Sequence, residues 1–170
     1  KKEFKFKILK TDFEFIPLRK PRKKGTESFL DFKYPEVFYS NLETEINDCY
    51  KYGLLNACLM LSRKVIEGLI YHLMDLKFRQ EIELRYDSKY KRALSFGKLV
   101  SNLSENNSRF HDEQQNLVKK TVNLIGNFRK EANKRIHEII EYVEDKNELD
   151  RMKIPEIIEI LLKLINKNKD

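Results

Sequence analysis

Apolar residues recur at helical spacing along most of this chain. The strongest run covers residues 54–78, where few polar positions remain. A helix that is apolar on nearly every side is expected to be enclosed by other helices. Arg63 and Glu67 interrupt this run four positions apart. We expect them to form a buried or half-buried pair that joins helices, with catalysis as a remote alternative.

Apolar residues repeat at the same helical spacing, but less densely, on both sides of this run, and they predict further helices there. They cover residues 35–52, about 95–103, about 112–137 and about 155–166. Residues 79–94 and 142–153 are polar and are interpreted as loops. Gly126, inside the helix that begins near residue 112, predicts a kink or close packing. Together these elements predict an all-α bundle of about five helices over residues 35–170.

The charge of the protein is concentrated at its N-terminus. Residues 1–25 hold ten Lys or Arg against three acidic residues, so they account for the whole formal net charge of +7. We therefore separate a basic arm, residues 1–34, whose first part alternates apolar and charged positions as a β-hairpin does. Four basic residues at the end of this arm are candidates for nucleic-acid binding, with a purely solubilising role as the equal alternative. They are Lys20, Arg22, Lys23 and Lys24.

The composition narrows the class of protein further. Apolar residues make up 41% and charged residues 36%, with only 5 Gly and 4 Pro, which favours a helical protein over a β-sandwich. Cys49 and Cys58 are interpreted as two buried thiols, and the three scattered His predict no metal or cofactor site. No apolar run is long enough for a membrane span, and no secretory signal is visible, so we expect a cytoplasmic protein. The chain starts at Lys1, which fits a processed or excised piece of a longer protein.

The candidate chemistry lies near the end of the helix over residues 112–137. Arg129, Asn133 and His137 recur every four residues and would form one polar stripe along it. An apolar stripe turned by about 100° is expected to be buried beside it. It consists of Phe128, Ala132 and Ile136. On spacing alone, three polar residues are more often a solvated helix face than a site.

Three segments, in their order along the chain, resemble those of a known family. They are Leu61–Glu67 (LSRKVIE), Ser95–Val100 (SFGKLV) and Phe128–His137 (FRKEANKRIH). Residues 35–168 resemble the HEPN superfamily of helical bundles, especially its bacterial branch found in phage defence and toxin–antitoxin systems. The motif of that branch looks like Arg-x-x-Gly-Asn-x-x-x-His. Arg129, Asn133 and His137 match it, with Ala132 where Gly is usual.

This resemblance implies an RNA-binding, metal-independent endoribonuclease that acts as a homodimer. In such an enzyme the RNA 2′-hydroxyl attacks the adjacent phosphate and a cyclic phosphate remains. His137 would be the general acid or base, Arg129 would bind the phosphate, and Asn133 would orient the phosphate or the imidazole. Arg135 is a further candidate for phosphate binding.

Two other functions stay open. The first is a non-catalytic HEPN module that dimerises or docks an antitoxin or another domain of a parent protein. It is favoured by the seven residues between Arg129 and His137, a longer spacing than in well-studied HEPN nucleases. The second is a helical scaffold that binds no nucleic acid.

Overall fold

A computed structural model describes residues 28–137 and 143–169, with the side chains of all of these except Ile136 and His137. The expected β-hairpin of the arm therefore lies outside the described residues. So do the four basic residues of the arm proposed to bind nucleic acid, Lys20, Arg22, Lys23 and Lys24.

The described chain is an all-α bundle, as predicted. Its helices are α1 (Val37–Lys51), α2 (Leu55–Lys77), α3 (Phe96–Glu105), α4 (Asp112–His137), α5 (Lys146–Arg151) and α6 (Ile154–Asn166). Two short 3-10 helices and one antiparallel hairpin complete it. These are η1 (Ile82–Leu84), η2 (Asn107–Arg109), β1 (Tyr86–Asp87) and β2 (Arg92–Ala93). Five helices of ten residues or more thus form the bundle, with α5 as a short addition.

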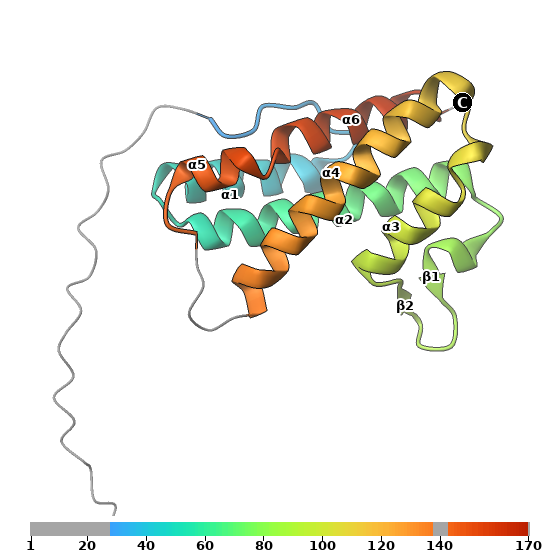
Figure 1. Ribbon diagram of the computed structural model, residues 1–170, viewed down its shortest axis with the longest axis horizontal. Coiled ribbons are helices and arrows are strands. Elements are labelled where there is room, and N and C mark those ends of the chain that lie inside the picture. The colour runs from blue at the N-terminus through green and yellow to red at the C-terminus, as the bar shows by residue number, and fades with distance from the viewer. Residues whose placement is uncertain (1–27, 138–142, 170) are drawn as a thin grey trace, which may run out of the picture.

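Helix α2 is the centre of the bundle, as its apolar character predicts. It packs against α1, α3, α4 and α6, and Figure 1 shows α4 crossing it obliquely. Ten of its 23 residues are buried. Gly68 lets α1 approach closely, because a Cβ at this position would lie 3.0 Å from two atoms of the Tyr39 side chain.

Polar side chains attach the segments outside the helices to this centre. Asn56, the polar residue inside the apolar run, accepts a hydrogen bond from the Val143 N–H at 2.8 Å. The amide oxygen of Asn47 accepts the N–H groups of Phe29 and Leu30, both at 2.9 Å. Leu30 is almost fully buried. The described end of the predicted arm therefore packs against α1.

The prediction of a long loop over residues 79–94 was wrong, because this segment contains η1 and the β1–β2 hairpin. Arg85 is the reason that a polar sequence is ordered here. Its guanidinium is buried, donates to the carbonyl oxygens of Phe78 and Arg79 at 3.0 and 3.2 Å, and pairs with Asp75 of α2 at 2.6 Å. A buried arginine with these partners stabilises a segment that its composition alone marks as a loop.

Two smaller expectations were also wrong, the second of them only for close packing. Residues 142–153 include α5, which begins where the Asp145 carboxylate accepts the Glu148 N–H at 3.1 Å. An Asp followed three residues later by Glu is a signature of a helix start. Gly126 lies in continuous helix with no atom within 4 Å of a Cβ placed on it, so it does not mark close packing. Among the described helices, none combines the length and apolar character that crossing a membrane requires.

Candidate functional site

The two stripes predicted on α4 are present in the side chains that the structure describes. Phe128 and Ala132 are fully buried, whereas Arg129 and Asn133 are half-buried on the neighbouring face. His137 is the last residue of α4, and its side chain, like that of Ile136, lies outside the described residues. The structure therefore defines two members of the predicted catalytic triplet.

Asn133 connects this stripe to the central helix. Its Oδ1 accepts a hydrogen bond from Nη1 of Arg63 at 2.8 Å. Arg63 therefore joins two helices, as expected, but it does so through Asn133 of α4, and no ion pair between Arg63 and Glu67 is found among the described residues. Glu67 follows one turn later on α2 and is half-buried near both Arg63 and Arg129.

The two arginines share one aromatic ring. The guanidinium carbons of Arg63 and Arg129 each lie 5.5 Å from the centroid of the Phe96 ring, within cation–π range. Ser95 fixes the start of α3 by accepting the Lys98 N–H at 3.4 Å, so Phe96 is the first residue of that helix. We call Arg63, Glu67, Phe96, Arg129 and Asn133 the arginine cluster.

Gly97 allows Arg129 to occupy this position. A Cβ at residue 97 would be 2.7 Å from Nη2 of Arg129 and 3.3 Å from its Cζ, both closer than an ordinary contact. The Arg129 guanidinium thus lies directly against the backbone of α3. Its Nε is buried and has no hydrogen-bond partner among the described residues. Buried N–H donors are nearly always paired in proteins, so this one requires an acceptor from outside the described residues.

The electrostatics of the arginine cluster favour an anion. Burial raises the pKa of the Glu67 carboxyl, and the nearby Arg63 and Arg129 guanidiniums act against this rise. With Glu67 ionised the cluster carries a net charge of +1, and with Glu67 protonated it carries +2. Residues 26–170 are neutral overall, so this positive charge is local. Paired guanidiniums bind phosphate and carboxylate oxygens through several donors at once.

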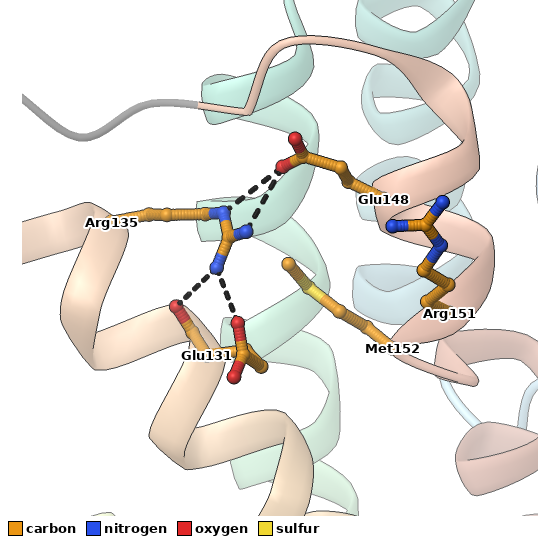
Figure 2. Close-up of a pocket in the computed structure, with 5 residues that line it drawn as sticks. All are labelled: Glu131, Arg135, Glu148, Arg151 and Met152. Carbon is orange, nitrogen blue, oxygen red and sulfur yellow. Dashed lines mark hydrogen bonds and ion pairs between the residues drawn. The ribbon is translucent and has the colours of Figure 1, made fainter.

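Arg135, the other basic residue proposed to bind nucleic acid on α4, lies in a different environment. It lines a pocket of about 180 Å³ with Glu131, Glu148, Arg151 and Met152 (Figure 2). Its guanidinium pairs with Glu131 at 2.6 Å and with Glu148 at 3.0 Å, and only 15% of its side chain is exposed. Burial lowers the pKa of Arg135, but the two glutamates outweigh this and raise it. A phosphate would have to compete with two carboxylates here, so phosphate binding by Arg135 stays a prediction.

Sequence reasoning did not assign Arg63, Phe96 or Gly97 to the site. The available signal was the presence of Arg63 and Glu67 inside an otherwise apolar helix, which marks charges that need partners on another element. Nothing in the sequence identified that partner as Asn133, which is 70 residues away. Within the described residues, no group of three or more His, Cys, Asp or Glu is arranged to hold a metal ion.

Comparisons with known protein families, curated proteins and solved structures find no match for this chain. The resemblance to HEPN domains therefore rests on the three sequence segments alone, and the arginine cluster is the structural feature that indicates a function.

Proposed function

We propose that this bundle binds RNA at the arginine cluster and cleaves it without a metal ion. One observation carries the proposal. Guanidiniums from α2 and α4 converge on the Phe96 ring, and the buried Nε of Arg129 has no partner among the described residues. A phosphodiester supplies the missing acceptor and the negative charge together.

The chemistry follows from the residue types on α4. The 2′-hydroxyl of RNA loses its proton and attacks the adjacent phosphorus, the bond to the 5′-oxygen breaks, and a 2′,3′-cyclic phosphate forms. Arg129 stabilises the charge that develops on the phosphoryl oxygens. His137, two turns after Arg129, transfers a proton as general acid or base. Asn133, held by Arg63, fixes the spacing between α2 and α4 on which the position of the phosphate depends.

We further propose a homodimer in the cytoplasm. A single Arg–Asn–His set offers one imidazole, whereas attack and departure each need a proton transfer, and a second copy supplies the second group. Light scattering should then give twice the 20.5 kDa mass of the chain. The basic arm adds sequence-independent affinity for RNA through its Lys and Arg residues. An antitoxin or a parent-protein domain is the protein partner that this function implies.

The test is cleavage of single-stranded RNA in excess EDTA. We expect cyclic-phosphate ends, no cleavage of DNA, and a loss of at least about 100-fold in rate for His137→Ala. His111→Ala is the matched control, because His111 is exposed and precedes α4, about 39 Å from His137 along the helix. Arg129→Ala should weaken RNA binding more than His137→Ala does. Intact RNA after incubation with a folded wild-type dimer refutes the nuclease.

A second candidate is a non-catalytic module, and one observation favours it. The Oδ1 of Asn133 is already bonded to Arg63, as expected if the polar stripe serves to join helices. If the protein is such a module, His137→Ala should leave every measured activity unchanged, and Asn133→Ala should lower the free energy of unfolding. Nuclease activity that survives both substitutions contradicts both candidates.

A further inference from the structure

The β1–β2 hairpin carries an exposed aromatic residue between cations. Tyr90, at the hairpin tip, is 59% exposed, and residues 88–93 are all exposed. The Nζ of Lys89 and the Cζ of Arg92 each lie 5.2 Å from the centroid of the Tyr90 ring. The ring thus contacts cations of its own hairpin and projects from the bundle.

The tip is held in one shape by local hydrogen bonds. The Asp87 carboxylate accepts the N–H groups of Lys89 and Tyr90 at 3.0 and 3.2 Å. Lys91 adopts the left-handed conformation, with φ of 50°, that reverses the chain. An Asp side chain that accepts backbone N–H groups two and three positions later is a common way to order a turn. Tyr90 is therefore presented by an ordered turn.

The base of the hairpin is fixed to the bundle independently of the tip. The Leu94 N–H donates to the Arg85 carbonyl at 2.9 Å, and the Arg85 side chain is bound to the end of α2. Nδ2 of Asn102, on α3, donates to the Leu84 carbonyl at 2.8 Å. A rigid base and an ordered tip reduce the conformational entropy lost when a ligand binds.

The hairpin is also a local concentration of positive charge. Residues 86–93 contain Lys89, Lys91 and Arg92 against Asp87 alone, a net charge of +2, whereas residues 26–170 are neutral overall. Single-stranded nucleic acids present phosphates and the flat faces of their bases. The cations of the hairpin suit the phosphates, and the exposed aromatic ring suits a base. An acidic peptide would use the cations but would leave the ring without a partner.

We propose that this hairpin binds single-stranded RNA, with a base stacked on Tyr90 and phosphates contacted by Lys89, Lys91 and Arg92. The inference rests on the proposed function and adds a second contact, on the RNA flanking the cleaved bond. Two residues, Leu94 and Ser95, separate β2 from Phe96 of the arginine cluster. In Figure 1 the hairpin tip and the C-terminal end of α4 both extend towards the lower edge of the molecule.

The experiment measures binding of fluorescent single-stranded DNA and RNA oligonucleotides to the full chain. Tyr90→Ala should weaken binding of both by about 5-fold or more, the lower end of what one stacked base contributes. Tyr90→Phe keeps the ring and should bind within about 2-fold of wild type. The matched control is Tyr52→Ala, since Tyr52 is 49% exposed beside Lys51 at the other end of α2, about 35 Å away by helix length.

Salt dependence tests the phosphate contacts. Replacing Lys89, Lys91 and Arg92 with Ser should reduce the slope of log K against log salt by up to about 2. Equal binding by Tyr90→Ala and wild type overturns the inference. So does an equal loss in Tyr90→Phe, failure of wild type to bind any oligonucleotide, or a polyglutamate peptide that competes as well as DNA of equal charge.

The measurements with DNA separate this inference from the proposed function, because DNA lacks the attacking 2′-hydroxyl and cannot be cleaved by this mechanism. If DNA binding depends on Tyr90 but RNA is left intact, the hairpin site is supported and the nuclease is refuted. If Tyr90→Ala cleaves and binds RNA as well as wild type does, the nuclease is supported and the hairpin site is refuted.

Discussion

Gly97→Ala should move the Arg129 guanidinium without removing it. The new Cβ would lie 2.7 Å from Nη2 of Arg129, whereas ordinary contacts begin near 3.4 Å. The guanidinium must therefore shift by at least about 0.7 Å. The atoms in the way are the far end of a flexible side chain, so the shift costs little folding free energy. The higher helix propensity of Ala, worth up to ~1 kcal/mol, acts in the opposite direction.

Activity should respond far more than stability. A misplacement of about 1 Å in a group that positions substrate can cost about 100-fold in rate. We therefore expect a free energy of unfolding within about 1 kcal/mol of wild type in urea titration and a fall of up to about 100-fold in single-turnover RNA cleavage. This combination separates a site residue from a structural one.

Gly126→Ala is the matched control for this substitution. It is also a helical glycine, but nothing lies within 4 Å of its added Cβ. It should stabilise the protein by up to ~1 kcal/mol and leave cleavage unchanged. Full activity of Gly97→Ala, or an equal loss in both variants, refutes the role given to the position of Arg129.

Three further predictions concern packing, ion pairing and pH. Gly68→Ala should lower the free energy of unfolding by about 1–2 kcal/mol, because its Cβ would meet the rigid Tyr39 ring at 3.0 Å; unchanged thermal stability contradicts this packing. Glu148→Gln removes a charged partner of the guanidinium in Figure 2 and should cost about 1–3 kcal/mol in urea unfolding, whereas Glu159→Gln, in an exposed pair, should cost under about 0.5. Equal costs would show that burial does not strengthen the first pair. The raised pKa of Glu67 means that the folded state holds its proton to higher pH than the unfolded state. Wild-type stability, measured relative to Glu67→Gln, should therefore be greatest below the ordinary pKa of 4.5, fall as pH rises above it, and level off beyond the raised pKa. A difference that grows with pH reverses the sign and rejects the burial argument.

The helices were predictable from the sequence because their apolar positions repeat every three or four residues. The same period predicted that Phe128 and Ala132 are buried, whereas Arg129, expected on an exposed stripe, is half-buried. Local periodicity contains no information on partners far along the chain. It therefore missed both the contact of Arg63 with Asn133 and the approach of Arg129 to Gly97.

The segments predicted as loops were missed for a different reason. The order of the hairpin depends on one buried arginine, Arg85, and an arginine in a polar sequence usually signals exposure. Helix α5 has six residues and buries only Leu149, which is too short a pattern to define a period. In both segments the signal lay in capping and in satisfied polar groups, which a search for apolar repeats does not detect.

The hairpin has its anchor and its tip on different residues, and this division affects how the protein can change during evolution. Arg85 and Asn102 fasten the base, whereas the exposed residues 88–91 make none of these anchoring bonds. Substitutions in the tip therefore carry little folding cost, while those at the anchor are constrained. Related chains can diversify the tip, and with it the sequences they prefer, on an unchanged bundle. The same division makes residues 88–91 a practical position for grafting a different recognition loop.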